Sequence, residues 1–328
     1  MELTNTTSFH AKMLCGSTGE TEMLCIIALK VTYALEQGWL VPVAQNQAWP
    51  VFDKPYQFEG VTLPAELDFR GRSIDFIVFG RAFSGNGRPT PRMRVAVSSG
   101  RLRHEIEVIG NRVWVKAKKG LIMSEPQPFS EMPLSNDRAF GGRSKLSGME
   151  MVHSINPEGR GLYLSEDEAV GRPLPNLERA DALIRDWNDQ PRPACLFKPI
   201  GSLELMGAQD PDPEKIASAA IEGAVKHTVP ELSASREDLG SDLRLTGFST
   251  NGDLLFPMPA LSGPSAHASV GARRSCLPSV LSRVVVLTRD QILVATYLAM
   301  FRYLMHPLEK RHVELRWNGD IKIPLKKG

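Results

Sequence analysis

Histidine and cysteine are the side chains best suited to acid–base, nucleophilic or metal chemistry, and neither forms a recognisable motif in this chain. The seven histidines are scattered, and none belongs to an H-x-H or H-E-x-x-H pattern. The four cysteines, Cys15, Cys25, Cys195 and Cys276, form no C-x-x-C pair. A structural zinc site needs ligand pairs at short spacing, so we expect neither a metal nor another cofactor.

Motifs for phosphate binding and for nucleophilic catalysis are also missing or incomplete. Residues 85–89 read Gly-Asn-Gly-Arg-Pro, but a phosphate loop continues into Gly-Lys-Ser/Thr and a helix, whereas Pro89 and Pro91 stand here. A G-x-S-x-G elbow is absent, so an α/β-hydrolase has no support. One enzymatic alternative stays open: a hydrolase or lyase whose site gathers Asp137, His153 and Arg160 from the middle of the chain.

Residues 70–119 form a basic stretch, with 12 basic and 3 acidic side chains. Such a stretch can contact phosphates. Few aromatic residues accompany it for base stacking, and two of its arginines have acidic partners in the hairpin predicted below. We therefore expect no nucleic-acid partner.

The clearest predicted element is a β-hairpin formed by residues 92–97 and 102–108, where apolar and polar residues alternate around Ser99-Gly100. Pairing Ser98 with Arg101 places six residues on the inward face, in the opposed pairs Val97–Leu102, Val95–His104 and Met93–Ile106. On the outward face, Arg94 then lies against Glu105 and Arg92 against Glu107.

Apolar runs predict further strands at residues 23–33, 39–43, 74–79, 112–116, 243–248, 254–256, 283–287, 292–303 and 313–317. A buried helix is the alternative for 292–305. Helical spacing predicts one helix over Leu177–Trp187, with Asn176 as its N-cap, and a second over about Pro213–His227, after Asp212.

These elements predict a mainly β, β-rich α+β fold, with antiparallel sheets in a sandwich- or barrel-like arrangement and one or two short helices. We expect a single domain over residues 1–328, with β-rich regions at 1–120 and 241–328 and a Pro/Gly-rich connection at 121–240. No targeting signal and no apolar stretch of about 20 residues is visible, which predicts a cytoplasmic location and no membrane contact.

The middle segment carries the most distinctive strings of residues. They are Ser130-Glu131-Met132-Pro133-Leu134, Arg138-Ala139-Phe140-Gly141-Gly142, Asn156-Pro157-Glu158-Gly159-Arg160-Gly161 and Pro173-Leu174-Pro175-Asn176-Leu177-Glu178. In this order they resemble the bacterial family catalogued as domain of unknown function 2169, found beside type VI secretion genes. The resemblance is weakest over residues 201–240, whose role it leaves open.

The resemblance implies a non-catalytic adaptor or chaperone that binds a secreted toxin effector and helps load it onto the secretion spike. A spike or spike-tip protein is the second partner implied. The candidate partner-binding or structural residues are Arg138, Phe140, Gly141, Gly142, Asn156, Pro157, Gly159, Arg160, Gly161, Leu174, Pro175 and Asn176. Two uses stay open for them: to brace a long connection over the β core, or to present a binding surface.

Overall fold

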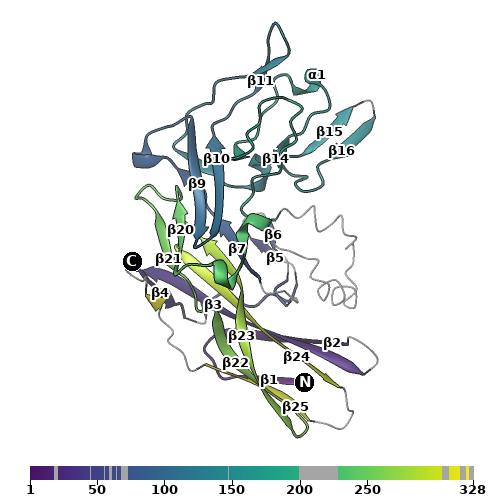
Figure 1. The fold of residues 1–328 in the computed structure, drawn as a ribbon, viewed down its shortest axis with the longest axis vertical. Coiled ribbons are helices and arrows are strands. Elements are labelled where there is room, and N and C mark those ends of the chain that lie inside the picture. Colours follow the sequence, from purple (N-terminus) through teal and green to yellow (C-terminus); the bar gives the residue numbers. More distant parts are fainter. Residues whose placement is uncertain are drawn as a thin grey trace.

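The computed structural model describes residues 1–17, 21–44, 46–54, 56–58, 61–63, 65–67, 73–146, 148–198, 228–304, 310–317 and 323–324. They form curled antiparallel and mixed sheets that make a half-barrel, with a few short helical turns (Figure 1). The predicted mainly β fold class is confirmed. Within the described ranges, no helix is long and apolar enough to cross a lipid bilayer.

The larger sheet contains 11 strands among the described residues. Its order is β1-β25-β22-β23-β24-β3-β4-β26, while β2 pairs with β3, and β7 pairs with both β23 and β19. The strands are β1 (Glu2–Asn5), β2 (His10–Ser17), β3 (Glu22–Glu36), β4 (Trp39–Pro42), β7 (Ser73–Phe79), β19 (Ser233–Ser235), β22 (Ser262–Val270), β23 (Arg273–Leu287), β24 (Ile292–Leu304), β25 (Arg311–Arg316) and β26 (Ile323–Pro324).

A second sheet has the order β18-β10-β9-β20-β21. Its strands are β18 (Leu177–Arg179), β10 (Leu102–Ile109), β9 (Arg92–Ser99), β20 (Asp242–Thr246) and β21 (Leu254–Pro257). Two-stranded sheets pair β5 (Tyr56–Phe58) with β6 (Val61–Leu63), β8 (Arg81–Phe83) with β13 (Glu131–Pro133), β11 (Trp114–Lys116) with β12 (Leu121–Met123), β14 (Phe140–Gly141) with β17 (Arg160–Gly161), and β15 (Arg143–Leu146) with β16 (Met149–Val152). The helical turns are α1 (Glu166–Ala169), η1 (Gly85–Gly87), η2 (Asn136–Arg138), η3 (Pro230–Leu232) and η4 (Arg236–Asp238).

The long strand β3 shows why the larger sheet has an apolar face on each side. Successive side chains of a strand point to opposite faces, so β3 contributes to two apolar clusters. One cluster includes Cys25, Ile27, Leu29, Val31 and Tyr33, and the other includes Leu24, Ile26, Ala28, Val51 and Leu67. Burial on both faces explains why residues 23–33 read as a continuous apolar run.

The strand β24 settles the alternative left open by the sequence. Residues 292–304 pair with β3 along its length, from Ile292 opposite Ala34 to Leu304 opposite Glu22. A strand is therefore correct here, and a helix is wrong. The predicted strands at 39–43, 74–79 and 313–317 are also confirmed, each within two residues of its predicted bounds. The strand predicted at 283–287 is the C-terminal part of β23, which begins ten residues earlier, at Arg273.

The predicted hairpin forms from β9 and β10, but its register differs from the prediction by two residues. Ser99 pairs with Leu102, and Val97 lies opposite His104. The turn residues are therefore Gly100 and Arg101, which puts glycine at a position with φ of 57°.

A two-residue shift keeps every side chain of the hairpin on its predicted face. Four of the inward residues pack in the main core: Val95, Val97, Leu102 and Ile106. Of the other two, His104 is buried and Met93 is half-buried. Both predicted ion pairs form as diagonal contacts, Arg94–Glu105 at 3.6 Å and Arg92–Glu107 at 3.7 Å. Arg94 also lies directly opposite Glu107, at 3.3 Å.

The helix predicted over Leu177–Trp187 is wrong. Its first residues form β18 at the edge of β10, with Glu178 opposite Glu107, and turns and irregular backbone follow. Glu178 is buried and bonded to Arg112, so tertiary pairing outweighs the local helical spacing. The second predicted helix, about Pro213–His227, lies outside the described residues.

Candidate functional site

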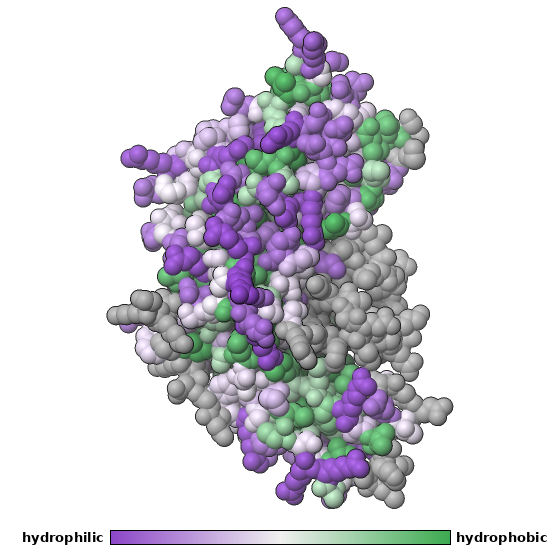
Figure 2. Space-filling model, viewed as in Figure 1, coloured by the Kyte–Doolittle hydropathy of each residue, from purple (hydrophilic) through white to green (hydrophobic). Residues whose placement is uncertain are grey.

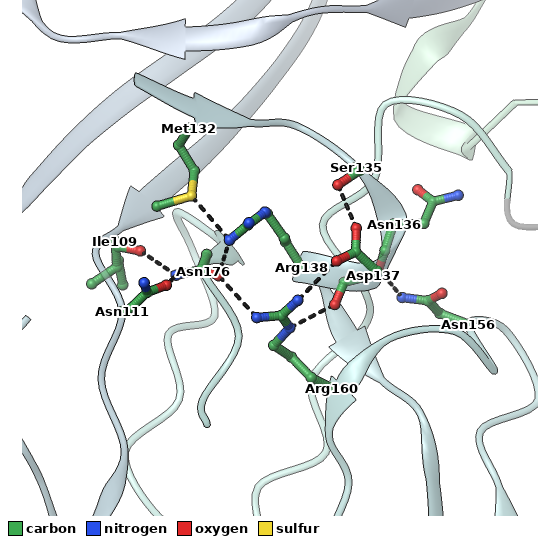
Figure 3. Close-up of polar contacts among 10 residues, drawn as sticks. All are labelled: Ile109, Asn111, Met132, Ser135, Asn136, Asp137, Arg138, Asn156, Arg160 and Asn176. Atoms are coloured by element: carbon green, nitrogen blue, oxygen red, sulfur yellow. Dashed lines mark hydrogen bonds and ion pairs between the residues drawn. The ribbon is translucent and has the colours of Figure 1, made fainter. Parts of the chain in front are cut away.

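The strings singled out in the sequence converge in the structure. We call residues 136–142, 156–161 and 174–176 the brace. Its centre is a short parallel pairing of β14 with β17, in which Phe140 lies opposite Arg160 and Gly141 opposite Gly161. Three separate segments are joined by hydrogen bonds between buried and half-buried groups (Figure 3).

Asn176 connects the brace to the second sheet. Its side-chain nitrogen donates to the Ile109 carbonyl at 2.9 Å and to Asn111 Oδ1 at 3.1 Å. Its side-chain oxygen accepts from Arg138 at 3.0 Å and from Arg160 at 3.4 Å. This buried amide was expected to cap a helix, and it acts instead as a junction between sheet and loop.

Asn156 plays the matching role inside the brace. Its side-chain nitrogen donates to the carbonyls of Asn136 at 2.8 Å and Phe140 at 3.0 Å. Its own carbonyl accepts from the backbone N–H of Gly142 at 2.8 Å and of Gly159 at 3.3 Å. The side chain is fully buried, so these bonds replace water for the surrounding backbone.

The glycines of the brace are required by close packing. Gly141 has φ of 142°, and a Cβ built on it would lie 2.1 Å from the Asn156 carbonyl oxygen. Gly161 has φ of 100°, and its Cβ would lie 2.8 Å from the ring of Pro175. No other residue fits either position without moving the backbone.

The remaining predicted residues complete this packing. Phe140 and Leu174 are buried together in a small apolar cluster with Trp114 and Leu162. Pro157, beside Asn156, is half-buried.

Burial, and then the charge of Arg160, lower the pKa of the Arg138 guanidinium below its usual range.

The enzymatic alternative named Asp137, His153 and Arg160, of which the structure brings two together. Arg160 donates to Asp137 Oδ2 at 2.8 Å and to the Asp137 carbonyl at 2.6 Å. His153 instead accepts the backbone N–H of Asn156 at Nδ1, at 3.0 Å, and packs edge-on against Phe140. Burial lowers the pKa of His153, which favours its neutral ring.

A cavity of about 730 Å³ opens beside the two-stranded sheet formed by β8 and β13. Its apolar lining comes mainly from Phe79, Phe197, Phe248, Leu254 and Leu287, and the ion-paired Arg81 and Glu131 also line it, 3.2 Å apart. No local sequence pattern marks this cavity, because its lining comes from six separate stretches of the chain.

A buried charge cluster on β3 was not predicted from the sequence. Lys30 Nζ lies 2.7 Å from Glu66 and 2.9 Å from the Pro50 carbonyl, and 4.5 Å from the centre of the Phe52 ring. Burial lowers the pKa of Lys30 to about 8, against the attraction of Glu66. The one signal was a lysine inside an apolar run. The contacts attach Pro50, Phe52 and Glu66 to the sheet.

The hairpin of β15 and β16 projects from the brace at the upper right of the molecule (Figure 1). Its side chains and the segment after it expose Leu146 (40%), Met151 (46%), Val152 (37%) and Ile155 (40%). Figure 2 shows hydrophobic side chains gathered in this region. No sequence pattern marks these residues. Leu146 and Met151 share one face of the hairpin, and Val152 lies on the other.

The base of this hairpin is held by the brace. Residues 143–155 lie between Gly142 and Asn156, and the N–H of Gly142 donates to the Asn156 carbonyl. His153 closes the other side by donating its N–H to the Gly142 carbonyl at 2.9 Å. Backbone hydrogen bonds of the brace therefore hold the two ends of the segment that carries the exposed hairpin.

Comparison with known proteins gives one match. The family model DUF2169, described as an uncharacterized protein conserved in bacteria, matches residues 20–203. This range covers more than half of the chain and includes the brace and the projecting hairpin. Searches of curated proteins and of solved structures find no match.

Proposed function

The chain belongs to the DUF2169 family of bacterial proteins, and we propose that it is a non-catalytic adaptor that binds another protein through the β15–β16 hairpin. The observation that carries the proposal is the exposure of Leu146 and Met151, which lie on the same face of the β15–β16 hairpin. Val152 and Ile155 are exposed nearby. Apolar side chains gathered on a projecting element are typical of a protein-binding surface.

The backbone of the hairpin supports the same role. Within the part of the chain that the structure describes, β15 and β16 pair only with each other. Their outer edges therefore present unpaired N–H and C=O groups, to which an extended segment of a partner can add as a further strand. Main-chain hydrogen bonds would supply affinity, and the apolar side chains would supply specificity.

The partner proposed is the one implied by the resemblance to this family, a secreted toxin effector of a type VI secretion system. In this role the adaptor stabilises the effector and presents it to the secretion spike. The brace supports the proposal because it fixes the base of the hairpin before a partner arrives, which reduces the entropy lost on binding.

The experiment compares two double variants in a pull-down of the toxin effector encoded beside the gene. Leu146→Glu with Met151→Glu places charges on the hairpin. Val115→Glu with Ile122→Glu is the matched control, because these exposed residues lie opposite each other on the β11–β12 hairpin. We expect at least a roughly tenfold loss of affinity in the first variant alone, since a buried apolar contact at an interface is replaced by charge.

Two outcomes would count against the proposal. If the effector is equally stable and equally secreted in cells that lack this protein, the adaptor function is wrong. If the Leu146/Met151 variant retains full binding while deletion of the protein abolishes secretion, the adaptor function stands and the hairpin is not the binding surface.

A further inference from the structure

Two of the four cysteines are cross-strand neighbours. Cys15 on β2 lies directly opposite Cys25 on β3, and their Sγ atoms are 3.0 Å apart. Directly opposed residues of antiparallel strands have Cα atoms about 4.5–5.5 Å apart, within the range of about 4.4–6.8 Å seen in disulfides. The two sulfurs therefore need only a short movement to bond.

The two thiols differ in their surroundings. Cys15 is half-buried at the sheet edge, whereas Cys25 is fully buried. The hydrogen bond with Cys25 lowers the pKa of the Cys15 thiol to about 7, with smaller contributions from Tyr303 and Arg311. The same hydrogen bond, and then burial, raise the pKa of Cys25. One accessible sulfur thus carries the thiolate, and its buried neighbour keeps the proton.

We propose that Cys15 and Cys25 are a redox-active pair that forms a cross-strand disulfide by exchange with a small-molecule disulfide. The Cys15 thiolate attacks one sulfur of that disulfide, whose S–S bond breaks, and the first thiolate leaves. Cys25 then gives up its proton to solvent and attacks Cys15 Sγ, which expels the second thiolate. The two cysteine thiols lose two electrons in total, and the small disulfide gains them as two thiols.

The bond would fasten β2 to the sheet. Among the described strands, β2 adds to the larger sheet only through β3. A cross-link between residues 15 and 25 restricts the unfolded chain and prevents separation of these strands. Oxidation should therefore stabilise this edge of the half-barrel and leave the brace, at the other end of the molecule, unchanged (Figure 1).

The test exposes the full chain to glutathione disulfide at pH 7, followed by alkylation of the remaining thiols and peptide mass spectrometry. In the wild-type protein, we expect the free thiols of Cys15 and Cys25 to disappear together. Their two peptides should then be recovered joined by a disulfide. In the Cys25→Ala variant, Cys15 should instead hold a stable mixed disulfide with glutathione. In Cys15→Ala, the buried Cys25 should stay unmodified.

Cys276 is the internal control, since it is exposed but lies opposite His267 rather than a cysteine. The oxidised protein should melt roughly 5 °C above the reduced one, a difference absent from both variants and reversed by a reductant. The proposal is overturned if glutathione modifies Cys276 while Cys15 and Cys25 remain thiols. It is equally overturned if the wild-type protein accumulates the mixed disulfide at Cys15 without resolving it.

Discussion

Buried polar side chains decide much of the local structure of this protein. Asn156 and Asn176 satisfy backbone carbonyls at strand ends and in the turns of the brace, where the regular ladder of hydrogen bonds stops. The buried Arg112–Glu178 pair works differently. Burial lowers the pKa of Arg112 and raises that of Glu178, so for both partners desolvation outweighs their attraction. The pair joins Arg112 to the start of β18.

His104 provides a prediction at this scale. Its ring is buried, Nε2 lies 3.0 Å from the Cys195 carbonyl, and burial lowers its pKa from the ordinary value of 6.5. As the pH falls below 6.5, the unfolded chain binds a proton that the folded chain does not, so stability falls. The loss is at most about 1.4 kcal/mol per pH unit.

Urea unfolding between pH 5 and 8 measures this effect. The His104→Gln variant keeps a donor for the Cys195 carbonyl but cannot titrate, so its stability should fall less steeply below pH 6.5. The curves of unfolding free energy against pH should run parallel for the two proteins above pH 7.5. Parallel curves over the whole range would show that His104 is not buried in its neutral form.

At the scale of elements, glycine positions set how closely the segments of the brace approach. β14 and β17 pair in parallel through residues that sit against Asn156 and Pro175, where a single extra carbon has no space. The projecting hairpin has the opposite character, because the turn at Gly148 has open space around it. The brace is therefore sensitive to substitution, whereas the hairpin tip is tolerant.

The matched pair Gly141→Ala and Gly148→Ala tests this contrast. Both glycines have positive φ, 142° and 84°, but only a Cβ on Gly141 meets a backbone atom within 4 Å. We expect Gly141→Ala to lose about 3 kcal/mol of unfolding free energy and Gly148→Ala about 1 kcal/mol, as measured by urea unfolding. Equal losses would mean that the brace yields to the added carbon.

Over the whole molecule, stability is concentrated in the long strands. β3, β23 and β24 pair over most of their length and bury side chains on both faces, while β15 and β16 share one short ladder. The proposed binding hairpin thus has some of the least extensive strand pairing in the described chain, and the core that carries it has the most extensive. Local opening should therefore cost less free energy in the hairpin than in the long strands.

Hydrogen exchange measures this distribution directly. We expect amides in the centre of β24, around Ala295, to exchange at least ~100-fold more slowly than those of the β15–β16 hairpin. Addition of the effector should slow exchange in the hairpin. Uniform protection across the two regions would contradict the predicted distribution.

The sequence by itself determined the class of fold and the faces of its clearest elements. Alternation and β-branched runs depend only on neighbouring residues, so they predicted the strands β3, β7, β9 and β10 and the inward side chains of the hairpin. The glycine- and proline-rich strings likewise marked the residues of the brace. These signals are local, and a chain carries them before it folds.

Only the tertiary structure decided the rest. Residues 177–187 have helical spacing, but residues 177–179 form a strand. They pair with the edge of β10, and Glu178 forms an ion pair with Arg112. β22, Ser262–Val270, was missed because its small residues carry no apolar run, and it exists through its pairing with β23 and β25. The cavity, the Lys30–Glu66 cluster and the Cys15–Cys25 contact join distant or opposed segments, and no local pattern encodes such proximity.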